Sequence, residues 1–346
     1  FFENLGGTIK ERHVLPGFYH DTLGEKDRHI ATEKIATFLK AAYARPVEKV
    51  NLKDAHRVGY TRDEAECLAT PLPITSPRGA YWALGRFGMK FGGLISDGIA
   101  VGNKTGFDSG SMLDYVYRNT ASGKTALGRF VDRNYIDAVG WKGIRQRKLN
   151  AQTLINRAME AVKESGRSVR VLDIAAGHGR YVVEALTSGR VRPDQILLRD
   201  YSDINVAAGS RLIASMGLSD VARFEKGDAF DADSVAAITP APTVGIVSGL
   251  YELFPDNAMI ERSLSGMARA LPEGGYLVYT CQPWHPQLEL IARTLTSHRA
   301  GQAWVMRRRS QGEMDQLVAA AGFEKIDQLI DEWCIFTVSL ARRTKS

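Results

Sequence analysis

The second half of the chain alternates short apolar runs with helical patterns. The first run, at 169–174, is interrupted only by Arg170 and Asp173, which is typical of a strand buried on both faces. Later runs are separated by stretches in which apolar residues recur every three or four positions. This alternation predicts an α/β domain whose mostly parallel sheet is linked by helical crossovers. The seven expected strands lie at 169–174, 196–198, around 224, 244–247, 276–279, 326–330 and 334–341.

The first half of the chain has a less regular pattern. Residues 10–18 predict a short strand. Thr61 and Glu64 have the spacing of a capping box, which would start a helix that reaches about Leu68. Further helices are expected where apolar residues recur at helical spacing, at 27–42, 112–118, 127–139 and 144–162.

Residues 81–110 differ from their surroundings in composition. Glycine, aromatic and aliphatic residues dominate this stretch, and few of its residues are charged. This stretch could form a packed lid or associate with a surface, and both interpretations remain open. We expect four parts along the chain: a tail at 1–45, a linker with a Gly-rich cap segment at 46–110, a helical cap at 111–166 and the sheet domain at 167–346.

Composition narrows the class of protein. The chain has 346 residues, of which 44% are hydrophobic and 24% charged, enough for one large domain with an appendage. No apolar run approaches the roughly 20 residues that cross a membrane, and the N-terminus does not resemble a secretion signal. We therefore expect a cytoplasmic protein, at most peripheral to the inner face of a membrane. The cysteines Cys67, Cys281 and Cys334 lie too far apart for metal-ligand spacing, so we expect no metal.

The turn after the first strand carries the clearest chemical signal. It reads Ala-Ala-Gly-His-Gly at 175–179, and glycines at such a turn let the backbone approach a ligand beside the unpaired N–H groups of the next helix. Asp200 ends the second strand, where a carboxylate can accept both ribose hydroxyls of a nucleotide. Asp228 follows the third strand, where an acidic side chain can meet an adenine amino group. The pattern predicts a nucleotide-binding sheet.

These motifs resemble those of the class I S-adenosylmethionine-dependent methyltransferases over about 180 residues. In that family an acidic residue and a glycine-rich turn end the first strand, as Asp173 and AAGHG do here, and Asp200 and Asp228 match the family's next two acids. The segments LPEGGYLV and AGFEKI resemble its fifth strand and its last helix-to-strand junction. The resemblance implies a Rossmann-like sheet and S-adenosylmethionine as cofactor. It places the cofactor on Asp173, Ala175, Gly177, Gly179, Asp200, Tyr201, Asp228, Ala229 and Ser248.

Two departures from the family pattern are visible. Ala175 stands where the family usually has its first glycine, and residues 241–243 lack the aspartate usual before the fourth strand. A nicotinamide-dependent dehydrogenase on a similar sheet is the rival interpretation. Such folds carry GxGxxG on the first turn, whereas this turn reads Ala-x-Gly-x-Gly, which favours the methyltransferase.

The methyl acceptor should lie beyond the carboxyl ends of the fourth and fifth strands. An O or N acceptor that loses a proton needs a base, and the loops there offer Glu252 and His285. Each also has a purely structural interpretation: Glu252 as a carboxylate at the start of a helix, and His285 as a residue of a turn. Tyr251 is a candidate wall of the methyl pocket. The aromatic residues expected to contact the substrate are Tyr115, Tyr117 and Trp284.

The densest basic cluster is Arg307, Arg308 and Arg309, beside Trp304. It could receive an anionic headgroup, although a solvated face is the simpler interpretation. No NPPY-type motif follows the fourth strand, and no basic stripe is interleaved with aromatic residues, so nucleic acid is not expected as the acceptor. We expect a small-molecule or lipid-headgroup acceptor.

Residues 1–45 resemble the last strand, histidine loop and final helix of a serine α/β-hydrolase. His20, within GFYHDTLGEK, occupies the place of the triad base, but no GxSxG nucleophile elbow occurs in this chain. The chain also begins with Phe1 rather than Met. Together these features suggest an upstream hydrolase domain, as in a bacterial methyltransferase family that joins the two. The alternative to an enzyme is a non-catalytic cofactor-binding module of such a protein.

Overall fold

The computed structural model describes residues 2–7, 9–45 and 50–344, and it divides the chain into two compact units between Asn51 and Leu52. The boundary expected between 45 and 46 touches residues 46–49, which lie outside the described residues. The boundaries expected after 110 and after 166 both fall inside the second unit. The helices expected to cap the sheet therefore form one unit with it.

The first unit contains a 3-10 helix, η1 (Phe2–Asn4), and one long helix, α1 (Arg28–Tyr43), close to the helix expected at 27–42. The strand expected at 10–18 is wrong, because these residues form turns and irregular backbone. A strand needs a neighbour to satisfy its N–H and C=O groups, and the described residues of this unit supply none. His20 is exposed here.

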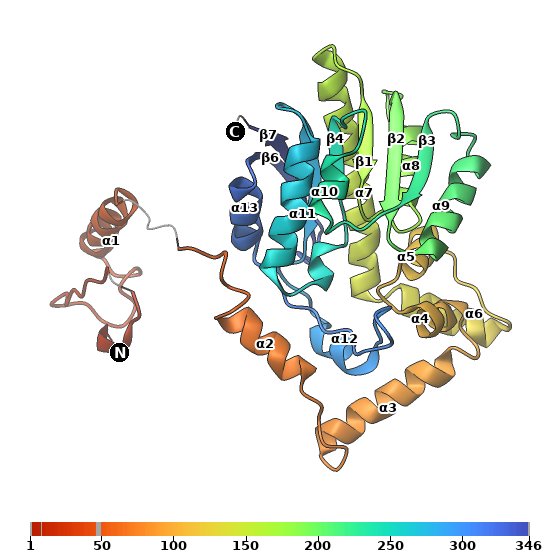
Figure 1. The fold of residues 1–346 in the computed structure, drawn as a ribbon. Helices are drawn as coiled ribbons and strands as arrows, with labels where there is room; N and C mark the ends of the chain where they lie inside the picture. The colour runs from red at the N-terminus through yellow and green to blue at the C-terminus, as the bar shows by residue number, and fades with distance from the viewer. Residues whose placement is uncertain (1, 8, 46–49, 345–346) are drawn as a thin grey trace. The chain divides into compact units, whose positions relative to one another are not determined.

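One seven-stranded sheet runs through the second unit, in the order β3-β2-β1-β4-β5-β7-β6 (Figure 1). β1 to β5 pair in parallel, and β7 lies antiparallel between β5 and β6. The expected Rossmann-like, mostly parallel α/β sheet is confirmed. The strands are β1 (Arg170–Asp173), β2 (Gln195–Asp200), β3 (Ala222–Lys226), β4 (Val244–Val247), β5 (Tyr276–Cys281), β6 (Phe323–Ile330) and β7 (Thr337–Arg343).

Helices cover both faces of the sheet, because successive strand residues point to opposite sides. Val171 packs in an apolar cluster with α7, α8 and α9, whereas its neighbour Leu172 packs in a second cluster with α10, α11 and α13. The central strands β1, β2, β4 and β5 are thus buried on both faces. These helices are α7 (Val139–Glu164), α8 (Arg180–Ser188), α9 (Asp203–Ser215), α10 (Ala232–Ala236), α11 (Asn257–Ala270) and α13 (Gln311–Ala320).

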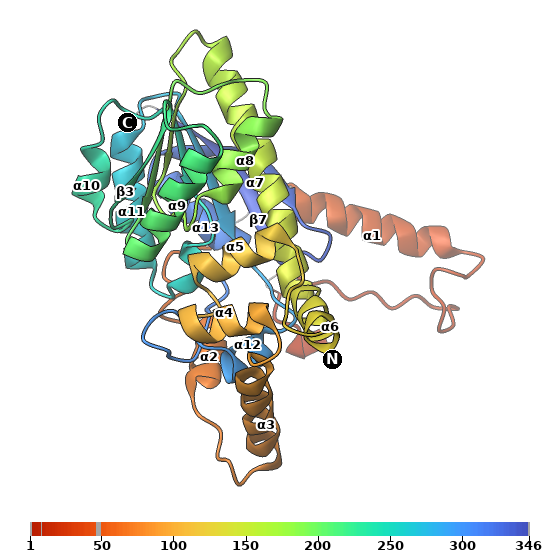
Figure 2. The same ribbon diagram turned by 90° about the vertical axis from the view of Figure 1, so that its right-hand side faces the viewer.

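The remaining helices gather at one end of the sheet in both views (Figures 1 and 2). They share a third apolar cluster with Trp304 and Phe336. This end is the one where the parallel strands finish, since Gly110 at the start of α5 lies against Gly177 after β1. We call these helices the cap: α2 (Tyr60–Ala69), α3 (Pro77–Gly92), α4 (Asp97–Thr105), α5 (Gly110–Arg118), α6 (Ala126–Ile136) and α12 (Leu288–Thr294).

Residues 81–110 fit both interpretations in part. α4 packs into the cap through Ile99, which is buried. α3 and the turn after it instead leave a row of large apolar side chains exposed, at Tyr81, Leu84, Phe87, Phe91 and Leu94. No helix in the described part of the chain is both long and apolar enough to cross a membrane.

The capping box expected at Thr61 is wrong. α2 begins at Tyr60 with Gly59 as its N-cap, and no side chain caps it. Glu64 instead accepts two hydrogen bonds from the guanidinium of Arg308, at 2.6 and 2.9 Å. A bidentate ion pair of this kind holds the carboxylate away from the start of the helix.

Candidate functional site

Asp173 lies at the carboxyl end of β1, beneath the glycine-rich turn. Its carboxylate is fully buried and accepts hydrogen bonds from the Tyr181 hydroxyl and from the backbone N–H of Ala175. Burial raises the pKa of Asp173 to about 7. Because both contacts are made within the protein, Asp173 stabilises the conformation of the turn.

The turn itself requires its two glycines. Gly177 and Gly179 have φ values of 58° and 73°, in the left-handed region that favours glycine. A Cβ on Gly179 would also lie 2.4 Å from the side chain of Leu198. Gly179 is the N-cap of α8, so the unpaired N–H groups of that helix begin at this turn.

Asp200 lies at the end of β2, beside the same turn. Its carboxylate accepts from the backbone N–H groups of Gly177 at 3.0 Å and Ser202 at 2.9 Å, and from the Asn205 amide at 3.0 Å. Burial raises the pKa of Asp200. Because a carboxylate offers about four acceptor positions, these bonds leave room for another donor.

The other expected cofactor residues follow the neighbouring strands. Asp228, after β3, is exposed and accepts from the Phe230 backbone N–H at 2.9 Å, while Ala229 beside it is buried. Ser248 follows β4 and is half-buried. Tyr201 is 58% exposed. The structure therefore brings all nine expected residues to the carboxyl ends of β1 to β4.

This edge is the topological switch point of the sheet. From β1 the chain continues to β2 and β3 on one side, whereas β4 and β5 lie on the other. In open α/β sheets the ligand crevice forms at this point, outside the carboxyl ends of the strands.

A loop at 296–303 reaches this edge as well. Asp108, between α4 and α5, accepts hydrogen bonds from the Ser297 hydroxyl and from the His298 backbone N–H, both at 2.6 Å. Burial on its own would raise the pKa of Asp108, but its bonds with His298 and Ser297 lower it. The His298 ring then lies 6.0 Å from the ring of Tyr201. Asp108 thus fixes the loop beside the residue that follows Asp200.

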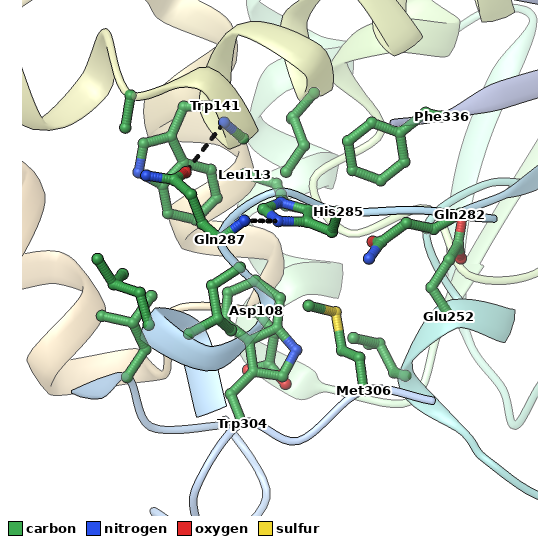
Figure 3. Close-up of a pocket in the computed structure, with 18 of the residues that line it drawn as sticks. Asp108, Leu113, Trp141, Glu252, Gln282, His285, Gln287, Trp304, Met306 and Phe336 are labelled. Carbon is green, nitrogen blue, oxygen red and sulfur yellow. Dashed lines mark hydrogen bonds between the residues drawn. The ribbon is translucent and has the colours of Figure 1, made fainter. Parts of the chain in front are cut away.

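A cavity of about 230 Å³ lies between the cap and the loops that follow β4 and β5 (Figure 3). Most of its lining is apolar. Trp141 and Trp304 stack with their ring centroids 6.3 Å apart, and Tyr135 meets Trp141 edge-on at 5.8 Å. We call this cavity the acceptor pocket.

Two charged residues form the polar end of the acceptor pocket. Arg147 of α7 and Glu252 after β4 are 4% and 7% exposed, and Arg147 Nη1 lies 3.8 Å from Glu252 Oε1. The Thr280 hydroxyl donates to the same Oε1 at 2.7 Å. Among the described residues, neither Glu252 Oε2 nor Arg147 Nε has a hydrogen-bond partner. Both side chains line the acceptor pocket, and these two unpartnered atoms are buried in its wall.

His285 lies in the lining between these polar groups and Trp141 (Figure 3). Its Nδ1 accepts a hydrogen bond from the backbone N–H of Gln287 at 3.0 Å. Burial lowers the pKa of His285 to about 4, so the ring is neutral at pH 7. The Gln287 side chain in turn accepts from the Gly140 backbone N–H at 3.3 Å.

Of the expected catalytic residues, Glu252 and His285 line the acceptor pocket, whereas Tyr251 does not. Tyr251 is 2% exposed, and its hydroxyl donates to Ser263 at 3.0 Å. Burial raises its pKa. Tyr251 packs in the interior, in the segment that follows β4.

The three expected substrate contacts also lie outside the lining of the acceptor pocket. The hydroxyl of Tyr115 donates to the buried carboxylate of Asp132 at 2.5 Å. Tyr117 packs with its ring 6.4 Å from that of Tyr181, and Trp284 is 45% exposed. Tyr115 and Tyr117 thus contact other side chains of the protein, whereas Trp284, in the loop after β5, is exposed.

The pocket contains residues that the sequence analysis did not identify, chiefly Trp141, Arg147 and Gln282. One of them has a signal in the sequence. Arg147 falls on the apolar face of its helix, three residues after Ile144 and four before Ala151. A charged residue on a core-facing stripe is rarely buried without a partner. Trp141 and Gln282 carry no comparable signal.

The arginine cluster is not a solvated face, and that expectation is wrong. Arg307 and Arg309 are both 3% exposed. Arg307 pairs with the buried carboxylate of Glu313 at 2.7 Å, and Arg309 donates to the Asn257 side chain at 2.8 Å. Buried guanidinium groups need such partners, and the tertiary structure supplies them. Both side chains therefore form part of the packed interior.

Comparisons with known proteins agree with this fold. The uncharacterized protein YnbC of Escherichia coli (strain K12) is 52% identical over 344 residues, which are 99% of this chain and 58% of that protein. The chain thus spans little more than half the length of this relative. A crystal structure of a possible exported protein from Bordetella parapertussis matches with a TM-score of 0.52 and 16% identity, over 78% of this chain and all of that one. This second likeness concerns the fold alone.

A magnesium protoporphyrin IX methyltransferase from Synechocystis PCC 6803, solved with bound SAH, is more distant. Its TM-score is 0.45 at 14% identity, over 71% of this chain and 97% of that one. A family model described as "putative methyltransferase" matches residues 35–343. This match covers all of the cap helices and all seven strands, and the chain belongs to that methyltransferase family.

Proposed function

We propose that this chain transfers a methyl group from S-adenosylmethionine to an O or N atom of a small-molecule acceptor. One observation carries the proposal: the glycine-rich turn, the Asp200 carboxylate and the acceptor pocket all lie at the same switch point of the sheet. Family membership supports methyl transfer in general.

The residues at this edge fit the cofactor. Asp200 retains an acceptor position for the ribose hydroxyls, and the exposed Asp228 can accept from the adenine amino group. Gly177 lets the backbone approach the ligand, while Tyr201 and Ser248 flank the crevice. When bound, S-adenosylmethionine supplies an activated methyl group on a positively charged sulfur. The protein then has to align the acceptor, exclude water and remove a proton.

The polar end of the acceptor pocket favours a neutral acceptor over an anionic lipid headgroup. The charge of Arg147 is balanced by Glu252, so the pair offers no net positive charge to a phosphate. A cytoplasmic location and an upstream α/β-hydrolase domain stay predictions, as does the role of His20.

Cofactor binding can be tested directly by calorimetry with S-adenosylmethionine. Asp200→Asn and Asp228→Asn should each weaken binding by about 10- to 100-fold, the effect of losing a hydrogen bond to a charged group. Asp220→Asn is the matched control, because this exposed carboxylate pairs with Arg192 at the opposite end of β3. Unchanged affinity in both site variants would refute the proposed cofactor site.

Turnover is tested by incubating the protein with methyl-labelled cofactor and metabolite extracts, followed by mass spectrometry. We expect label in at least one small molecule. Tight cofactor binding with no labelled product in any extract would instead favour a non-catalytic cofactor-binding module.

A further inference from the structure

On the basis of the proposed function, we propose that the acceptor pocket binds an uncharged hydroxylated aromatic compound of one or two rings, and that Glu252 takes the proton of its hydroxyl group. The proposal rests on the unpartnered atoms of Glu252 and Arg147 at one end of a cavity with aromatic walls.

The walls and the volume define the body of the ligand. Indole and phenol rings from Trp141, Trp304 and Tyr135 line the cavity, and flat aromatic surfaces pack best against other flat rings. An apolar protein cavity of about 150 Å³ binds benzene. A cavity of about 230 Å³ therefore has room for a substituted ring or a two-ring compound.

The polar end defines the reacting group. Glu252 Oε2 needs a donor and Arg147 Nε needs an acceptor, and leaving such atoms unpaired inside the protein costs free energy. A hydroxyl group meets both needs at once, because it donates one hydrogen bond and accepts others. An ether or a hydrocarbon cannot donate to the carboxylate.

The charges around this end favour a neutral ligand. Arg147 and Glu252 balance each other, His285 is neutral, and Asp108 is held by Ser297 and His298. An acceptor carrying a carboxylate would place a second negative charge beside Glu252 in a region of low dielectric. The ligand we infer is therefore uncharged before it reacts.

Additional donors point to a second polar atom on the ligand. The indole Nε1–H of Trp304 has no hydrogen-bond partner in the described part of the chain. Trp304 and neutral His285, whose proton lies on Nε2, both line the cavity. Both donate, so a second neutral oxygen, such as a carbonyl or another hydroxyl, would complement them.

The reaction balances with these groups. The acceptor hydroxyl gives its proton to Glu252 Oε2, and the oxygen uses its electron pair to bond the methyl carbon. The carbon–sulfur bond breaks as this bond forms, and its electrons stay on sulfur. The products are a neutral aryl methyl ether and the demethylated cofactor, and Glu252 then releases its proton to solvent.

Calorimetry with three probes tests the ligand class on the unaltered protein saturated with S-adenosylhomocysteine. We expect 1-naphthol to bind at least about 10-fold more tightly than 1-methoxynaphthalene, which cannot donate, and than 1-naphthoate, which is anionic. Equal binding of the ether or the anion, or no binding of 1-naphthol, would overturn the inference. Failure of S-adenosylhomocysteine to bind in the same titrations would instead contradict the proposed function.

A glycine substitution tests the location of the ligand. A Cβ on Gly140 would lie 2.9 Å from His285 Nε2 and narrow the pocket, whereas a Cβ on Gly88 meets nothing within 4 Å. Gly140→Ala should weaken 1-naphthol binding about 10-fold and leave S-adenosylhomocysteine affinity unchanged. Gly88→Ala is the control and should change neither. Unaltered 1-naphthol affinity in Gly140→Ala would place the ligand elsewhere.

Glu252→Gln tests the proton acceptor. The glutamine keeps the shape but cannot take the proton, so methylation of 1-naphthol should fall at least about 100-fold while 1-naphthol binding changes only a few-fold. Wild-type rates in this variant would refute the role of Glu252. If the loss of charge beside Arg147 prevents folding, the probe series on the unaltered protein still decides the ligand class.

Discussion

The backbone N–H of Gln287 donates to Nδ1 of His285 at 3.0 Å. In a neutral imidazole the nitrogen that accepts has no proton, so the proton of His285 lies on Nε2. His285 therefore presents a donor to the acceptor pocket, and its single lone pair is engaged by the backbone. Of the two candidate bases, Glu252 is the one whose free atom can accept a proton.

His285 should titrate far below an ordinary histidine. Burial lowers its pKa to about 4, so we expect its imidazole NMR signals to shift around that pH and to stay constant between about pH 6 and 8. His285→Asn assigns the signals. The unfolded chain binds a proton here near pH 6.5, so this site contributes stability above that pH, which is lost as the pH falls toward 4. A titration midpoint near 6.5 would show that the ring is not desolvated.

Asp173 should change stability in the opposite direction. Its pKa of about 7 exceeds the ordinary aspartate value, so between about pH 4 and 7 the folded state binds more protons than the unfolded chain. As the pH rises through that window, the unfolding free energy of the wild type, relative to that of Asp173→Asn, should fall by up to about 1.4 kcal/mol for each pH unit. Urea denaturation at several pH values measures this difference. A difference that is independent of pH would contradict the prediction.

The buried ion pair of Arg307 and Glu313 should matter more to stability than the neighbouring half-buried pair of Arg308 and Glu64. Glu313→Gln leaves a buried guanidinium without its charged partner and should cost about 3–5 kcal/mol of unfolding free energy. Arg308→Ala breaks the half-buried pair with Glu64 and should cost about 1 kcal/mol or less. Urea denaturation of both variants provides the comparison. Equal costs would mean that Arg307 is solvated after all.

The sheet and the cofactor edge were predictable because their signals are local. A strand buried on both faces is a continuous apolar run, and the glycine-rich turn directly follows one, as at 169–179. Asp173, Gly177 and Asp200 each stand at the end of a strand or in its turn. Parallel strands bring such ends to one edge, so the place of these residues followed from the order of the elements.

The acceptor pocket could not be predicted in the same way. Trp141 comes from α7 and Trp304 from a loop far along the chain, and only the packing of the cap places them together. The prediction for the arginine cluster was wrong for a related reason. Nothing near Arg307 in the sequence shows that its carboxylate partner is buried as well, so a run of charges resembles a solvated surface until the packing is known.

The position of β7 has a consequence for the order of folding. This strand, Thr337–Arg343, pairs on one side with β5 and on the other with β6, so it completes the middle of one half of the sheet rather than its margin. During synthesis β6 has no partner within the sheet until β7 has emerged, and the apolar surface that covers α13 stays incomplete until then. β7 is therefore the last of the seven strands to be synthesised, and the sheet can be completed only after the other six have been made.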